Sequence, residues 1–308
     1  MSHRSHPLFP LLATVFLFAA CEKTIDFDGE LTDPLPVMVS QPETDSLWQV
    51  RLSWSRFFLG NSTIATIDDA TVSVEVNGIV LGTATPQGDG MYATGVTPHA
   101  GDTLTLRATV PGHGLLTAGC RMPHAPQASL LKVEYDTTVT QYYDYETDAP
   151  IYDTSGEATA YVELQDAAKR QDYYMVRLKT HYDWGDEYLY FGIDDNVLFE
   201  ESAGDDLFGM DDDGSYGNRV FFDDSRINGQ RHLLKIYYNY TQDPLQYILE
   251  IYTLSRELYL YLQSVAKARE DDGLGGIVSE PVQVQCNVVG GIGVVGGMNR
   301  TVLPLTLK

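Results

Sequence analysis

Cys21 is the residue whose chemistry the sequence defines most clearly. It follows an apolar run, residues 11–20, that ends in the letters LFAA and is preceded by a short polar start containing Arg4. Signal peptides have this order of segments, and the run is too short to anchor as a membrane-spanning helix. The letters before Cys21 resemble a lipobox, whose cysteine thiol accepts a diacylglycerol thioether before the peptidase cuts ahead of it. We therefore predict a signal peptide over residues 1–20 and lipidation of Cys21; an ordinary signal peptide with an incidental cysteine is the alternative.

Residues 21–30 are an acidic tether behind the lipidated cysteine. They read CEKTIDFDGE, which resembles the signal that places lipoproteins of Bacteroidota on the outer face of the outer membrane. Each acyl chain contributes about 0.8 kcal/mol per buried methylene group, so two or three chains anchor a protein stably. We expect the acylated Cys21 to bind the lipid bilayer and the protein to be outer-membrane, lipid-anchored and exposed on the cell surface.

Asp211 and Asp213 are the candidates for a metal site. They belong to an acidic stretch ending in Gly214, and hard cations such as Ca²⁺ bind several carboxylate oxygens at alternating loop positions. An EF-hand register fails, because it places Gly209 at the first ligand position and Val220 at the twelfth. The sequence favours a solvated acidic loop over an irregular metal site.

Cys120 and Cys286 are the two thiols that remain once Cys21 is lipidated. In an exported protein they could form one disulfide, and two free buried thiols are the alternative. The histidines outside the leader show no close pair of the kind that binds zinc. They are His99, His113, His124, His181 and His232.

Catalytic signatures are absent from the sequence. There is no Gly-x-Ser-x-Gly elbow, and the acidic pairs Asp194-Asp195 and Asp223-Asp224 are unselective among 43 acidic residues. The glycine-rich residues 290–297 lack the Lys-Ser/Thr ending of a phosphate loop, so we expect them to adopt positive φ in a tight loop against a sheet. We expect no enzyme activity and no cofactor.

The net charge of −23 limits the classes of partner. An acidic surface repels nucleic acid and anionic headgroups, so we expect no nucleic-acid partner. The same charge also serves solubility in a salty exterior. Tyrosine is abundant, with 20 Tyr against 11 Phe, which suits half-exposed sheet surfaces and ligand contacts.

The elements that carry these residues are predicted to be mainly β. Residues 31–122 alternate short β-type runs with turn signals, as in an immunoglobulin-like sandwich. The strand over residues 71–76 reaches Asn77-Gly78, a strong two-residue hairpin signal, and residues 79–84 would return antiparallel.

Residues 127–308 follow a stiff linker and are predicted as a larger, aromatic-rich β domain. We expect a curved sheet or partial barrel with one helix over residues 255–269 packed across it. Ser255 is a suitable N-cap, and Leu258, Leu262 and Val265 fall on one helix face. The predicted fold class is therefore mainly all-β, with two modules.

The closing segment resembles a known family. Residues 280–297 read EPVQVQCNVVGGIGVVGG, and Glu280, Pro281, Asn287, Gly290, Gly291 and Gly293 carry the likeness. The segments CEKTIDF, DATV, FDD and NGQ agree in order. The chain is thereby similar to the DUF4249 family of Bacteroidota lipoproteins, although Cys286 departs from the usual aromatic or polar residue.

The resemblance implies a role as well as a fold. Members often lie beside genes of TonB-dependent outer-membrane transporters, which implies a non-enzymatic accessory protein that captures an unknown ligand or caps such a transporter. The competing hypothesis is an adhesive or structural cell-surface protein.

Overall fold

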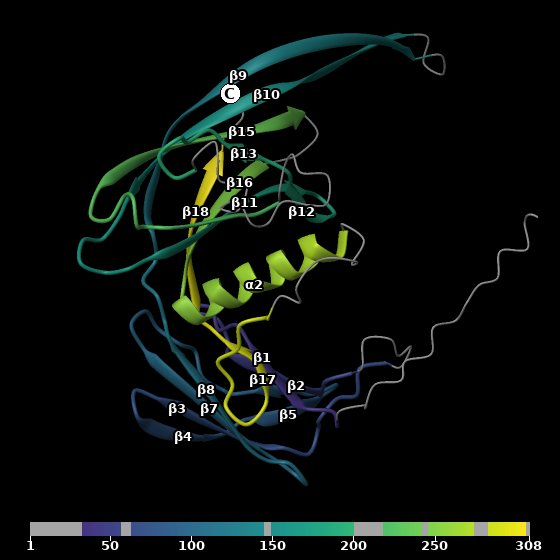
Figure 1. Cartoon of the computed structure of the whole chain (residues 1–308). Coiled ribbons are helices and arrows are strands. Elements are labelled where there is room, and N and C mark those ends of the chain that lie inside the picture. Colours follow the sequence, from purple (N-terminus) through teal and green to yellow (C-terminus); the bar gives the residue numbers. More distant parts are fainter. Residues whose placement is uncertain are drawn as a thin grey trace, which may run out of the picture. The chain divides into compact units, whose positions relative to one another are not determined.

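The computed structural model describes residues 33–56, 63–144, 149–199, 218–241, 246–273 and 283–305 (Figure 1). From Pro34 onward the chain forms one compact unit. The predicted signal peptide, Cys21, the tether, Asp211, Asp213, Glu280 and Pro281 lie outside the described residues.

Two sheets form the first sandwich. The first has the order β17-β1-β2-β6-β5 and the second has the order β4-β3-β7-β8. The bounds are β1 Pro36–Ser40, β2 Gln49–Trp54, β3 Thr71–Val76, β4 Ile79–Thr83, β5 Thr85–Gly88, β6 Met91–Ala93, β7 Thr103–Val110, β8 Gly114–Arg121 and β17 Ile292–Val295.

The strand order confirms the immunoglobulin-like prediction. Strands β1, β2, β6 and β5 follow the A-B-E-D order of such domains, and β4, β3, β7 and β8 follow C′-C-F-G. Alternate residues of both sheets point into one core, as the period-two pattern requires; Leu52 and Leu106 are fully buried there. Asn77 and Gly78 both have positive φ, which turns β3 directly into β4.

Two further sheets form a second sandwich. One has the order β13-β15-β10-β9, and the other has the order β12-β11-β16-β18 with β14 paired to β11. The bounds are β9 Gln127–Asp144, β10 Ala149–Gln165, β11 Tyr173–Tyr182, β12 Gly185–Leu189, β13 Gly192–Ile193, β14 Val220–Asp223, β15 Arg231–Thr241, β16 Gln246–Leu254 and β18 Met298–Leu305.

The second sandwich gives the predicted curved-sheet or partial-barrel module its topology. Val162 and Ile236 from one sheet share a buried core with Val176 and Ile251 from the other. Two open sheets therefore face each other, and neither closes on itself. The all-β prediction holds, but aromatic content alone did not distinguish one curved sheet from two packed sheets.

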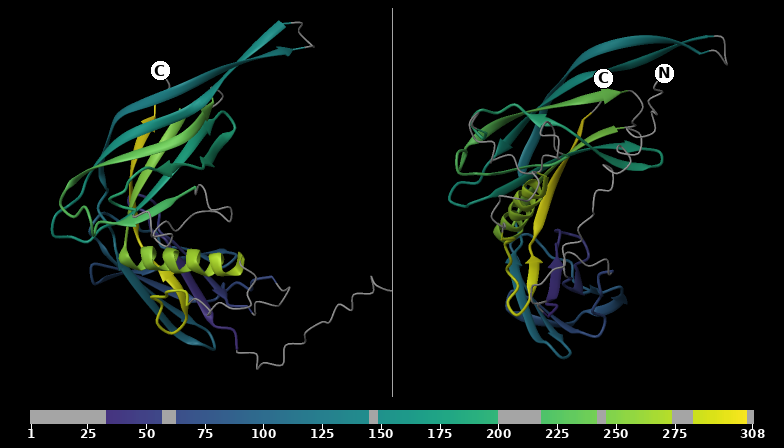
Figure 2. Two further views of the ribbon diagram at one scale, coloured as in Figure 1. Left: turned by 45° about the horizontal axis from the view of Figure 1, so that its top comes forward. Right: turned by 45° about the vertical axis from the view of Figure 1, so that its right-hand side comes forward.

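Helix α2, Arg256–Gly273, packs on the outer face of the second sandwich (Figure 2). Leu258 and Tyr259 contact Tyr173 of β11 and Tyr252 of β16 in a separate apolar cluster. Ser255 caps the helix, because its Oγ accepts a hydrogen bond from the N–H of Leu258 at 3.4 Å. The predicted start and N-cap are confirmed, and the helix ends four residues beyond the prediction. No helix among the described residues is both long and apolar enough to cross a bilayer.

The closing segment connects the two sandwiches and corrects the predicted domain boundary. β17 pairs in parallel with β1 in the first sandwich, while β18 pairs with β16 in the second. Val288 and Val295 are buried in the first core. Residues 127–308 are therefore not one separate domain, because the chain returns to the first sandwich before it ends in the second.

Gly293 shows why this return requires glycine. Its φ is +121°, and a Cβ there would lie 2.1 Å from the carbonyl oxygen of Met38 on β1. Any side chain would therefore push β17 away from its partner strand. The prediction of positive φ against a sheet is confirmed here and at Gly290, whose φ is +86°.

We predict that Gly293→Ala lowers the free energy of unfolding by about 3 kcal/mol or more, since it adds a backbone clash to left-handed strain. Gly112→Ala is the matched control, because Gly112 also has positive φ but a Cβ there meets nothing within 4 Å. That control should lose only about 1–2 kcal/mol. Denaturant unfolding of both variants measures the difference, and equal losses would contradict the assigned clash.

Candidate functional site

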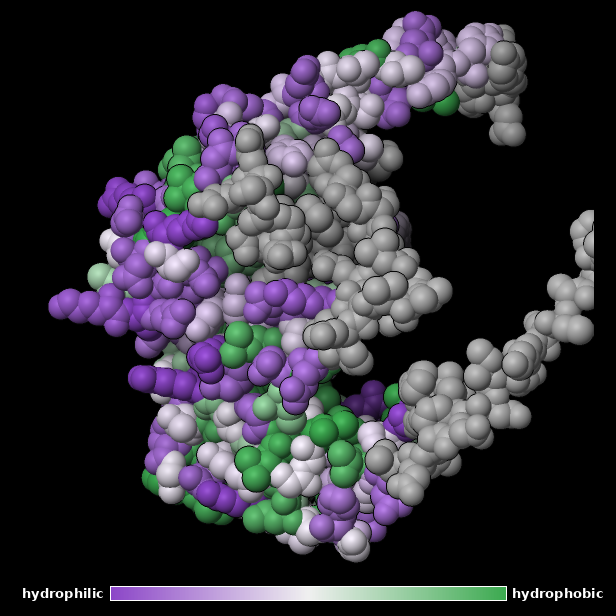
Figure 3. Space-filling view, viewed as in Figure 1, coloured by the Kyte–Doolittle hydropathy of each residue, from purple (hydrophilic) through white to green (hydrophobic). Residues whose placement is uncertain are grey.

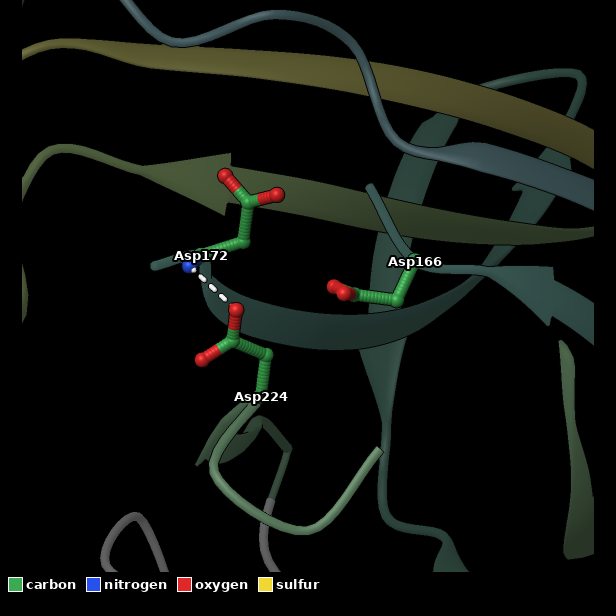
Figure 4. Close-up of side chains that lie close together, drawn as sticks. All are labelled: Asp166, Asp172 and Asp224. Atoms are coloured by element: carbon green, nitrogen blue, oxygen red, sulfur yellow. Dashed lines mark hydrogen bonds between the residues drawn. The ribbon is translucent and has the colours of Figure 1, made fainter. Parts of the chain in front are cut away.

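Asp166, Asp172 and Asp224 form a buried carboxylate cluster at one end of the second sandwich (Figure 4). Asp166 follows β10, Asp172 precedes β11 and Asp224 follows β14. One oxygen from each lies within 4.8 Å of the others, and each residue is at most 4% exposed. The β10–β11 connection supplies two of the acids, and the end of β14, distant in sequence, supplies the third.

Each carboxylate already accepts hydrogen bonds. Tyr174 donates its OH to Asp166 Oδ1 at 2.6 Å, and the N–H of Gly229 donates to Asp166 Oδ2 at 2.7 Å. Arg170 Nε donates to both oxygens of Asp172, at 2.7 and 2.9 Å. These donors fix the β10–β11 loop, which carries both Asp166 and Asp172.

Asp224 joins the β10–β11 loop to the turn after β14. Its Oδ2 accepts from the N–H of Asp172 and from the side chain of Asn228, both at 2.9 Å. Asn228 also donates to the carbonyl of Arg170 at 2.9 Å. The three aspartates, Arg170 and Asn228 therefore form one hydrogen-bonded hub.

The charges of the hub are unbalanced, with three carboxylates against the single guanidinium of Arg170. Burial raises the pKa of Asp224, and the negative charges of Asp166 and Asp172 add to this effect. The hydrogen bond from the N–H of Asp172 acts in the opposite direction. A proton on Asp224 is therefore one means of relieving the repulsion.

Of the residues that the structure describes, these three aspartates are the group able to hold a metal ion. Oxygen ligands suit a hard cation such as Ca²⁺, which takes six to eight of them. Most of the carboxylate oxygens instead face protein donors. The geometry therefore favours a structural hub over an open metal centre.

The structure keeps Cys120 and Cys286 as free thiols, so the disulfide alternative is wrong. Cys120 points into the core of the first sandwich, whereas Cys286 is exposed and makes a local contact with the N–H of Val288 at 3.3 Å. Burial raises the pKa of Cys120 to about 12. Neither thiol is positioned for metal binding with the other.

The family-motif residues that are described have structural positions. Asn287 donates to the carbonyl oxygens of Gly119 at 3.0 Å and Val295 at 2.8 Å, and its own Oδ1 accepts from the N–H of Val295. Gly290 and Gly291 lie too close to β8 and β1 for a Cβ. The motif thus fastens the closing segment to the first sandwich.

Two other acidic pairs are separated by the fold. Asp195 contacts His232 and also accepts from the N–H groups of Val197 and Leu198 at 2.9 and 3.0 Å, so it caps a turn. Asp223 accepts from the N–H of Ser225, while its neighbour Asp224 enters the hub. Two hub residues, Asp224 and Asn228, lie in the FDD and NGQ segments that carry the family resemblance. Nothing in the sequence singled out Asp166 or Asp172.

Comparisons with known proteins identify a family for the chain but no curated relative. Residues 22–303 match the model of the family described as "Domain of unknown function (DUF4249)". No curated protein matches the chain. Among solved structures, an alpha-L-rhamnosidase from Dictyoglumus thermophilum aligns with a TM-score of 0.36 and 10% identity over 72% of this chain. The aligned part is 28% of that enzyme, and a likeness this weak carries no argument.

The free thiols predict selective labelling. In the folded protein a maleimide should modify Cys286 and leave Cys120 unmodified, because Cys286 is exposed and Cys120 is buried. Denaturant without reductant should then open Cys120 to the same reagent. Mass spectrometry of proteolytic peptides reads both sites, and a Cys120–Cys286 cross-linked peptide would contradict the structure.

The raised pKa of Asp224 predicts a pH-dependent contribution to stability. The folded state holds the Asp224 proton more tightly than the unfolded state, so this contribution is present at acid pH and is lost as pH rises through the folded-state pKa. Asp224→Asn removes the titration. The stability of this variant relative to wild type should therefore increase from about pH 4 to pH 7.

Denaturant unfolding at several pH values measures this relative stability. Asp223→Asn is the matched control, since it changes the adjacent carboxylate that lies outside the hub. A constant difference between Asp224→Asn and wild type across the range would refute the effect.

Proposed function

The chain belongs to the DUF4249 family, and from this premise we propose that it is a lipid-anchored protein of the outer membrane's outer face that assists a TonB-dependent transporter. Lipidation of Cys21, origin in Bacteroidota and the transporter partner are parts of this proposal. Support comes from the leader sequence, from the resemblance, and from the shape of one hairpin.

The distal half of the β9–β10 hairpin is the observation that carries the proposal. Among the described residues, β10 pairs with β15 only from Ser155 onward, and residues 149–154 pair with β9 alone. In Figure 1 the two strands run beyond the rest of their sheet. A two-stranded ribbon is marginally stable in water, and contact with a partner would stabilise it.

The side chains of this ribbon are unusually apolar for their exposure. Val139, Tyr142, Tyr143, Ile151 and Tyr152 are each at least 50% exposed. Tyrosine supplies large rigid contact area with a polar tip, and this is the composition of protein and ligand contacts.

One face of the ribbon continues the core. The register places Val139, Tyr143 and Tyr152 on the same face as Val133 and Tyr135, which pack against the second core. The row of apolar side chains therefore continues along the hairpin past the part of it that packs against the second core. We assign this overhanging face, which we call the hairpin arm, to contact with the transporter.

The buried polar groups of the second sandwich fit a binding role better than a catalytic one. In the part of the chain that the structure describes, the carboxylates of the hub face their own donors. Such groups rigidify a frame, and the contact surfaces are then supplied by the exposed strands.

Strand β4 favours the second candidate, adhesion. Ile79, Val80 and Leu81 are all more than half exposed on this edge strand of the first sandwich. Figure 3 shows further hydrophobic side chains on the surface of the same sandwich. Exposed edges with apolar side chains pair readily with other chains.

Co-purification distinguishes the two candidates. The tagged full chain would be purified from detergent-solubilised outer membranes, and co-eluting proteins would be identified by mass spectrometry. We expect a roughly stoichiometric transporter barrel with the wild type. The variant Val139→Ser/Tyr143→Ser/Tyr152→Ser should lose at least about 90% of it, since it removes the apolar contact area.

The matched control changes three exposed apolar residues elsewhere: Ile79→Ser/Val80→Ser/Leu81→Ser. It should retain the barrel. If the wild type elutes alone while protease shaving still finds it on the surface, the accessory role is excluded. A loss of cell–cell adhesion in the β4 variant would then favour adhesion.

A further inference from the structure

The outer face of the second sandwich carries a cluster of charged residues next to the area that α2 covers. Arg177 and Lys179 lie on β11, Glu250 lies on β16 and Arg300 lies on β18. The register places Arg177 directly opposite Glu250. In a chain with 20 basic and 43 acidic residues, such a gathering of cations is notable.

Glu250 is the centre of this cluster and its oxygens are fully used. Oε1 accepts from Arg300 Nη1 at 2.8 Å and lies 3.3 Å from Lys179 Nζ. Oε2 accepts from the OH groups of Tyr252 at 3.0 Å and Tyr188 at 3.4 Å. Glu250 is 1% exposed, so these four donors compensate a buried charge.

The other cations of the cluster also have acids of their own. Lys179 Nζ lies 2.8 Å from Asp186, and Arg300 Nε lies 2.8 Å from Glu43. These cations use Glu250, Asp186 and Glu43, so none of these three described carboxylates pairs with Arg177.

Arg177 is consequently a cation without an ion pair to any residue that the structure describes. Its guanidinium carbon lies 3.4 Å from the centroid of the Tyr188 ring. Its Nε is buried, and within the described part of the chain it donates no hydrogen bond. A buried donor without a partner is rare in proteins, so the hydrogen-bonding capacity of the Arg177 guanidinium is incompletely used.

The arrangement also holds Arg177 in a fixed orientation. Tyr188 is anchored through its OH to Glu250, and the ring face then supports the guanidinium plane. Stacking on an aromatic ring occupies the face of the guanidinium, and its two terminal Nη groups can then form two parallel hydrogen bonds to a planar oxyanion.

We propose that Arg177, supported by Tyr188, is a binding site for an oxyanion, the carboxylate or phosphate group of a small ligand. The oxyanion accepts from the two Nη groups of Arg177 in the bidentate mode. The inference deepens the proposed function and rests on it for its biological meaning, because it assigns an acidic group to the ligand that the protein captures. Binding itself needs neither the anchor nor the transporter.

Nuclear magnetic resonance of the arginine Nε–H groups tests the site directly. The ¹⁵N-labelled full chain in detergent would be titrated with sodium acetate and, separately, with inorganic phosphate. Ionic strength would be held constant with sodium chloride. The Arg177 signal is identified by its loss in Arg177→Lys. We expect this signal to shift saturably with at least one of the two anions.

Variants of Tyr188 test the supporting ring. Tyr188→Leu removes the ring and should weaken the affinity about tenfold, whereas Tyr188→Phe keeps the ring and should weaken it less. Arg231→Lys is the matched control, because Arg231 is an exposed arginine near Glu163 on a different sheet, and it should leave the titration unchanged.

The two titrations also separate the two sources of the oxyanion. A response to acetate alone assigns a carboxylate ligand, and a stronger response to phosphate assigns a phosphorylated one. An Arg177 signal that stays fixed under both anions, or equal affinities in wild type and Tyr188→Leu, would overturn the site. Either result is independent of whether the protein co-purifies with a transporter.

Discussion

The structure depends on the parallel pairing of β17 with β1. This pairing brings the closing segment back to the first sandwich, and the chain then passes within a few residues into β18 of the second. Gly296 is part of this passage, because a Cβ there would lie 2.5 Å from the Cβ of Leu258 in α2. The N–H of Gly297 donates to the Oγ of Ser255, the N-cap of the same helix. One short segment therefore joins both sandwiches and the helix, and its glycines are the condition for the close approach of their backbones.

The second constraint is the surplus of acidic groups. An interior tolerates carboxylates only when donors compensate them, and the second sandwich does this in two ways. At the hub, backbone N–H groups and neutral side chains supply most of the donors, and burial together with the charges of Asp166 and Asp172 raises the pKa of Asp224. At Glu250, two cations and two tyrosines supply them. At the hub, the carboxylates accept hydrogen bonds from the donors around them. In the cluster around Glu250, Arg177 Nε donates to none of the described residues.

Local signals in the sequence predicted individual turns and the helix start correctly. Contacts between segments that are distant in the sequence could not be predicted from such signals. Asn77-Gly78 and the Ser255 cap act within a few residues, so the hairpin and the helix start are confirmed. The β17–β1 pairing joins opposite ends of the chain and has no local signature, and for that reason the domain boundary was wrong. The buried carboxylate hub was missed for the same reason, since single aspartates at strand ends look like ordinary surface acids. Cys120 and Cys286 show the limit of residue type, because chemistry allowed a disulfide that the geometry does not form.

The hairpin arm and Arg177 belong to the same sandwich but place different demands on it. The arm needs freedom from its own sheet, and the end of β15 pairing at Ser155 provides this. Arg177 needs a rigid surrounding, because an arginine that could swing would find one of the many acids nearby on the surface. Anchoring of Tyr188 by Glu250 prevents this, and Glu250 is itself immobilised by Lys179 and Arg300. A frame that is rigid at its centre and extended at its edge thus fits the proposed binding of a small anion and of a large partner on separate surfaces of one sandwich.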